Sequence, residues 1–213
     1  MNTHYKDKNM CIYKVTSSLY DNKAYILVDN KSSESIIIDT PENPNELIRI
    51  AKDTLVKAIL ITHNHIDHTQ GLQEVAYSIP SPIGIGEADA GALLNTPDFY
   101  LKDNDIITAG TISLKAISTP GHTPGSTCFI VGQHLFSGDT LFPGGPGKSE
   151  SPQTLTQIVN SITQKLFIFG DDVTFYPGHG HDGNIGVSKQ EYRVFKSKKH
   201  PEDLCGDIIW LKH

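Results

Sequence analysis

Cysteine, long apolar runs and basic clusters are all scarce in this sequence, and each scarcity excludes a class of protein. The three cysteines among 213 residues stand far apart, so they fit neither a disulfide framework nor a cysteine-rich zinc site. No apolar run reaches the roughly 20 residues that a membrane helix needs. The first ten residues lack the apolar core of a signal peptide. We therefore expect reduced thiols, no membrane partner and a cytoplasmic location.

The charged residues give a mildly acidic balance, with 18 basic and 24 acidic side chains and a net charge of -6. The densest basic stretch, residues 196–199, is too short to make a nucleic-acid footprint. We therefore expect no nucleic-acid partner. The chain is long enough to bury a substantial core, and we expect one domain over residues 1–213.

Apolar periodicity predicts an α+β fold. Predicted strands cover residues 11–16, 24–29, 35–39, 57–62, 83–85, 112–118, 127–131, 134–137 and 173–176. Predicted helices cover residues 44–52, 70–77, 87–94, 155–166 and 188–196. Strands followed by helices, twice along the chain, favour two sheets packed face to face with helices outside. We expect the tail, residues 201–213, to pack back onto the domain through its apolar residues 208–211.

The most informative segment is His63-Asn64-His65-Ile66-Asp67-His68, which follows the apolar strand at residues 58–61. In an extended stretch His63 and His65 point the same way, because side chains alternate with period two. The chain must then turn, so that Asp67 and His68 project on a different line. One short string can therefore serve two adjacent metal ions.

Three further segments place a ligand-type residue in a turn after an apolar strand. They are Pro-Gly-His-Thr around His122, Ser-Gly-Asp-Thr around Asp139 and Pro-Gly-His ending at His179. Each alone is also typical of an ordinary polar turn. Together with the first string they supply five imidazoles and two carboxylates, which suits two metal sites with open positions for water.

With these motifs in this order, the sequence resembles the metallo-β-lactamase-fold hydrolase superfamily. The resemblance implies an αβ/βα four-layer sandwich with two divalent metal ions, zinc first and iron or manganese as alternatives. It implies a first ion held by His63, His65 and His122, and a second held by Asp67, His68 and His179. Asp139 would bridge both ions, and Asp67 and Asp139 would serve catalysis. Asp39, which ends the strand at residues 35–39, matches the first motif of the superfamily; it would orient the ligand loop, or else be a simple turn residue.

Within the superfamily the segment from Gly138 to Lys148 resembles the glyoxalase II-like (hydroxyacylglutathione hydrolase-like) group. Lys148 stands where that group has a cation that contacts the substrate, and Pro146 stands where it has Cys. The resemblance therefore implies a hydrolase of small acyl thioesters without fixing glutathione as the thiol. Alternatives are a lactonase of the same superfamily, a mononuclear-iron persulfide dioxygenase and a non-catalytic, metal-stabilised binding protein. The expected partner is a small-molecule substrate.

Overall fold

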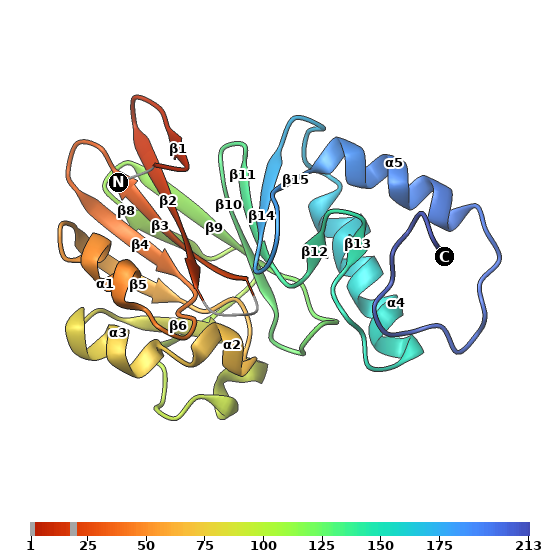
Figure 1. The fold of residues 1–213 in the computed structure, drawn as a ribbon, viewed down its shortest axis with the longest axis horizontal. Coiled ribbons are helices and arrows are strands. Elements are labelled where there is room, and N and C mark those ends of the chain that lie inside the picture. Colours follow the sequence, from red (N-terminus) through yellow and green to blue (C-terminus); the bar gives the residue numbers. More distant parts are fainter. Residues whose placement is uncertain (1–2, 18–20) are drawn as a thin grey trace.

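The computed structural model describes residues 3–17 and 21–213, and its strands form two large sheets that face each other (Figure 1). The first sheet runs in chain order through β1 (Tyr5–Lys6), β2 (Met10–Ser17), β3 (Asn22–Asp29), β4 (Glu34–Ile38), β5 (Leu55–Leu60), β6 (Ile83–Gly86) and β7 (Phe99–Leu101). The second runs in the order β15 (Gly183–Asn184), β14 (Thr174–Pro177), β11 (His134–Gly138), β10 (Thr127–Val131), β9 (Ile112–Ser118) and β8 (Ile106–Ala109). The short strands β12 (Leu141–Phe142) and β13 (Gly145–Pro146) pair separately.

Helices cover the outer face of each sheet, which completes the four layers. The first sheet carries α1 (Asn45–Ala51), α2 (Ile66–Thr69), α3 (Leu72–Ser78) and the 3₁₀-helix η1 (Glu87–Ala92). The second sheet carries α4 (Pro152–Ser161), its π-helical continuation η2 (Ile162–Leu166) and α5 (Ile185–Lys196). The predicted αβ/βα sandwich is thereby confirmed. None of the described helices is long and apolar enough to cross a membrane.

Strands that are buried on both faces explain the three apolar clusters of the core. Along β4, Ile36 and Ile38 point into the space between the sheets, whereas Ile37 points toward α1 and α3. This alternation follows from the two-residue period of a strand. The cluster on the far side joins the second sheet to α4 and α5 and includes Trp210, which is fully buried.

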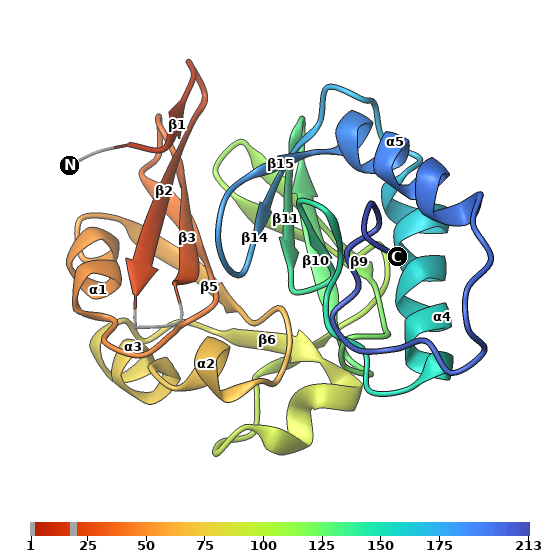
Figure 2. The same ribbon diagram turned by 45° about the vertical axis from the view of Figure 1, so that its right-hand side comes forward.

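The C-terminal segment packs onto the domain as predicted. In Figure 2 it runs beside α4 and α5. Ile208 and Trp210 are buried, whereas Ile209 and Leu211 are exposed, so alternate residues make the contact. The backbone of Trp210 donates to the Gly144 carbonyl at 2.8 Å, which ties the tail to the loop that leads to Lys148.

Several predicted boundaries are wrong for identifiable reasons. The helix predicted over 70–77 is α3, which begins at Leu72 after Gly71, and the short helix α2 that precedes Gly71 was not predicted. A Cβ on Gly71 would lie 2.4 Å from the Pro41 carbonyl oxygen, so the chain approaches too closely there for another residue. The segment predicted as a helix over 87–94 is a 3₁₀-helix that ends at Ala92. The helix predicted over 155–166 begins at Pro152, where Ser151 caps it, and becomes π-helical after Ser161.

Strand direction brings the predicted ligand residues to one edge. β4 and β5 are parallel, and so are β11 and β14. β9 runs in the same direction as β11, since β10 pairs antiparallel with both. The carboxyl ends of these five strands lead to Asp39, His63, His122, Asp139 and His179.

Candidate metal centre

The first group of ligand-type atoms consists of His63, His65 and His122, each offering one nitrogen within 4.8 Å of the others. Nδ1 of His65 lies 3.0 Å from Nε2 of His122. The His63 ring centroid lies 4.8 Å from that of His65 and 4.9 Å from that of His122. Three convergent imidazoles are a donor set that suits zinc and other first-row divalent ions.

The second group consists of Asp67, His68 and His179. Nε2 of His68 lies 3.2 Å from Nε2 of His179. The latter atom also lies 3.2 Å from Oδ2 of Asp67. Two imidazoles and a carboxylate form a second donor set of the same kind.

Asp139 lies between the two groups. Its Oδ1 is 3.5 Å from Nε2 of His68, and its Oδ2 is 3.5 Å from Nε2 of His179 and 3.7 Å from Nε2 of His122. Among the described residues, the buried atoms without a hydrogen-bond partner include Asp139 Oδ1 and His63 Nε2. A buried polar atom without a partner is costly, and a cation in either group would satisfy it. The residues present therefore fit bound divalent metal.

Asp39 orients two of the imidazoles from behind. One carboxylate oxygen accepts from the Thr62 amide at 2.8 Å, and the other accepts from the Thr62 hydroxyl at 2.8 Å and from Nδ1 of His68 at 2.9 Å. The Thr62 oxygen in turn accepts from Nδ1 of His63 at 3.0 Å, because its single proton goes to Asp39. Both rings therefore direct Nε2 into the centre.

The backbone of Asp39 adopts the left-handed conformation, with φ at 61°. This conformation is uncommon for a residue other than glycine and costs free energy. The carboxylate is 2% exposed. A strained and buried turn residue that is bonded to His68 directly and to His63 through Thr62 is placed as an orienting group would be.

Other contacts fix the remaining ligand-type residues. The Lys148 carbonyl accepts from Nδ1 of His122 at 2.9 Å, so that ring also presents Nε2 to the centre. The side-chain amide of Asn22, at the start of β3, donates to the carbonyl and to Oδ2 of Asp67, both at 3.0 Å. A Cβ on Gly178 would lie 2.2 Å from Oδ1 of Asp139, so glycine is needed for the close approach of the chain there.

Asp89 joins two ligand loops through one carboxyl group. This residue of η1 has no exposed surface. Its Oδ2 accepts from the Asn64 amide at 3.0 Å and from the Thr123 hydroxyl at 2.6 Å, and its Oδ1 accepts from the Gly125 amide at 2.7 Å. The loop that carries His63 and His65 and the loop that carries His122 are thus held at a fixed distance.

Burial and charge shift the protonation of the cluster in two directions. Burial, with the neighbouring imidazoles, lowers the pKa of His63 well below its usual value, and burial also lowers the pKa of His65. The hydrogen bond from His179 is the main cause of a lowered pKa for Asp67. Burial opposes the charged form of His68, but Asp39, Asp139 and Asp67 together outweigh it and raise the pKa of His68 to about 9. Neutral imidazoles and an ionised carboxylate are the forms that bind a cation. The shifts of His63, His65 and Asp67 favour those forms, whereas His68 has to release its proton when it binds a cation.

Lys148, the predicted substrate-binding residue, and His134 differ in their exposure. The Lys148 side chain is exposed, next to the carbonyl that holds His122. His134, at the start of β11, is half-buried: its ring stacks on Tyr176 and its Nδ1 hydrogen bonds to the Tyr176 hydroxyl at 2.8 Å. Sequence reasoning missed the roles of Asn22, Thr62 and Asp89. Asn22 and Asp89 lie outside every motif, whereas Thr62 directly precedes the string that begins at His63.

The sequence profile of the metallo-beta-lactamase superfamily matches residues 21–194. The chain belongs to this superfamily. It is 32% identical over 169 residues to the probable hydroxyacylglutathione hydrolase glo2 of Schizosaccharomyces pombe, which covers 75% of this chain and 64% of that protein. The chain thus spans less than two thirds of that relative.

Two further relatives extend the comparison. The human mitochondrial persulfide dioxygenase ETHE1 is 29% identical over 181 residues, covering 82% of this chain and 70% of that protein. A metallo-beta-lactamase structure from Staphylococcus aureus superposes with a TM-score of 0.76 at 27% identity, covering 87% of this chain and 62% of the other. The predicted superfamily, with its similarity to hydroxyacylglutathione hydrolases, is thereby confirmed, while these relatives differ in the reactions that their names give.

Proposed function

We propose that this protein is a dinuclear metal-dependent hydrolase that cleaves small acyl thioesters, with zinc as the first candidate metal and iron or manganese as alternatives. The observation that supports it best is the position of Asp139 between the two groups of ligand-type residues. A carboxylate that faces both groups suits a bridging ligand. The similarity to a probable hydroxyacylglutathione hydrolase supports the thioester as the bond that is cleaved.

In this proposal His63, His65 and His122 hold one ion, Asp67, His68 and His179 hold the other, and Asp139 contacts both. The bound ions would supply a hydroxide nucleophile near neutral pH and would polarise the substrate carbonyl.

The chain's own residues prepare the site for that chemistry. Asp39 and Thr62 keep the Nδ1 protons of His63 and His68 pointing outward. The Lys148 carbonyl does the same for His122. Asn22 holds one oxygen of Asp67 in place. Such preorganised ligands do not have to be reoriented in each turnover.

Lys148 is the proposed substrate-binding residue. Its backbone lies against His122 and its side chain is exposed, so its ammonium is free to reach a carboxylate on the thiol portion of a substrate. A thioester suits the centre because its thiolate leaves without strong help from a general acid. We retain from the sequence the expectation of a cytoplasmic protein.

A persulfide dioxygenase is the second candidate, favoured by the similarity to human ETHE1 over 82% of this chain. The two candidates differ in metal content and in their need for oxygen. The test is an assay of metal-replete protein, with and without oxygen, on an acyl thioester, an acyl lactone and a persulfide. Thioester hydrolysis without oxygen supports the proposal. Oxygen-dependent consumption of the persulfide alone would replace it with the second candidate, and turnover of the lactone alone would make the protein a lactonase.

A further inference from the structure

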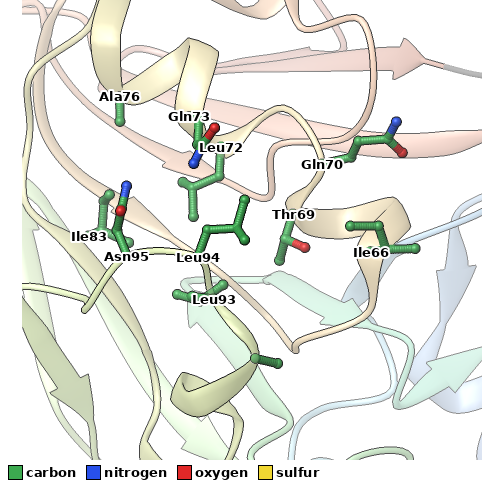
Figure 3. A pocket seen from close by; sticks show the side chains of 11 residues that line it. Ile66, Thr69, Gln70, Leu72, Gln73, Ala76, Ile83, Leu93, Leu94 and Asn95 are labelled. Atoms are coloured by element: carbon green, nitrogen blue, oxygen red, sulfur yellow. The ribbon is translucent and has the colours of Figure 1, made fainter.

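An apolar cavity of about 270 Å³ lies beside α2, outside the cluster of ligand-type residues. Figure 3 shows the side chains that line it, which come from α2, α3 and the link between them, from β6, and from the end of η1 and the segment after it. Seven of its eleven lining residues are Ile, Leu or Ala, and the other four are Thr, Gln or Asn, so none is charged. Concave, mostly apolar surfaces with a few polar groups are typical of small-molecule sites.

Two aliphatic side chains of this cavity remain largely in water. Ile66 is 70% exposed and Leu94 is 84% exposed. A single exposed leucine is ordinary. Two exposed aliphatic side chains in the lining of one cavity form apolar surface that an aliphatic ligand would remove from water.

The cavity adjoins the candidate metal centre along the chain. Ile66 stands between His65 and Asp67, and consecutive Cα atoms are about 3.8 Å apart. Ile66 and Thr69 are three residues apart and therefore share the face of α2 that lines the cavity. His65 and Ile66 are both exposed, so a substrate that reaches His65 lies one residue away from the cavity wall.

We propose that this cavity receives the aliphatic tail of the substrate's acyl group, an inference that rests on the proposed thioesterase function. The charges of the cavity and of Lys148 indicate where each part of the substrate binds. An uncharged, mostly aliphatic wall suits an alkyl tail and offers no cation to a carboxylate. The exposed ammonium of Lys148 suits the anionic thiol portion instead. The preferred substrate is then a thioester with an alkyl chain and not an acetyl group.

The test uses neutral N-acetylcysteamine thioesters with acetyl, butanoyl and octanoyl groups. For the wild type we expect kcat/KM to rise by roughly fourfold for each methylene that is buried, until the cavity is full. Leu94→Ser makes the mouth polar and Ala76→Phe fills the space beside α3. Both should reduce the ratio of octanoyl to acetyl kcat/KM by at least about tenfold. Leu55 is also exposed and begins β5, whereas the ligand-type residues follow the other end of this strand. Leu55→Ser is therefore the matched control and should leave the ratio unchanged.

Binding of decanoate to the metal-depleted protein, measured by calorimetry, separates this inference from the proposed function. Equal hydrolysis of all chain lengths, with no effect of either variant, would overturn the inference and leave the thioesterase standing. Decanoate binding that Ala76→Phe abolishes, in a protein that hydrolyses no thioester, would support the apolar site and reject the thioesterase. No decanoate binding together with a flat chain-length series would leave the cavity without this role.

Discussion

Asp89→Asn is the substitution whose consequence follows most directly from the contacts of the site. The side chain keeps its size, but one carboxylate oxygen becomes an NH₂ group. Oδ2 of Asp89 accepts from Asn64 and Thr123, and Oδ1 accepts from Gly125. An amide has only one oxygen, so the NH₂ group must face either the Gly125 amide or the donors of Asn64 and Thr123.

The orientation that costs less stability places the amide oxygen toward Asn64 and Thr123. The buried Gly125 amide then has no acceptor, which costs about 1–3 kcal/mol of the free energy of unfolding. The connection between the loops that carry His65 and His122 then rests on the amide oxygen alone, without the contact to Gly125. Loss of a group that orients ligands typically weakens metal affinity by about 10–100-fold, and we expect a loss in that range.

Two assays measure these effects separately. Urea unfolding of metal-free protein gives the free energy of unfolding, and competition with a chromogenic chelator gives metal affinity. Asp98→Asn is the matched control, because Asp98 is exposed and accepts one backbone bond, from Ile83 at 2.7 Å; it should stay within about 0.5 kcal/mol of wild type. Wild-type stability and wild-type metal affinity in Asp89→Asn would refute the conclusion that Asp89 holds the two ligand loops together.

The other predictions concern the centre itself. Asp139→Ala should lower thioester hydrolysis at least about a hundredfold and reduce metal content; both ions retained with normal turnover would contradict the bridging role. Lys148→Ala should raise KM for an anionic thioester with little change in kcat, and should hardly affect a neutral one, which marks a loss of uniform binding. Gly178→Ala should weaken metal binding, because the added Cβ would lie 2.2 Å from Asp139 Oδ1, whereas Gly91→Ala, with nothing within 4 Å, should not. When free metal is present at 100 times the dissociation constant of a site, removing the metal should lower Tm by about 5–10 °C for a domain of this size. Scanning calorimetry with and without chelator measures the shift.

The layered fold and the composition of the cluster could be predicted from the sequence because their signals are local. The apolar run from Ile36 to Ile38 and the string from His63 to His68 can each be recognised within a few residues. Strands such as β1, β7 and β12 have two or three residues, too few for a periodic pattern to form. Their pairing depends on neighbours distant in sequence.

Asp89 and Asn22, unlike Asp39, were not predicted as orienting residues, and the reason is the same. Asp89 bonds to partners 25, 34 and 36 residues away, and Asn22 bonds to Asp67, 45 residues away. A lone Asp or Asn carries no spacing that distinguishes it from a turn residue. Only the folded chain shows which polar residues stand behind the centre.

The number of metal ions per chain tests the central claim most directly. Elemental analysis of metal-replete wild-type protein, after exhaustive dialysis and with protein concentration from amino-acid analysis, should give two ions per chain. Asp67→Ala, which removes one donor from the second group only, should give one. A single ion in the wild type at saturating metal would contradict a dinuclear centre.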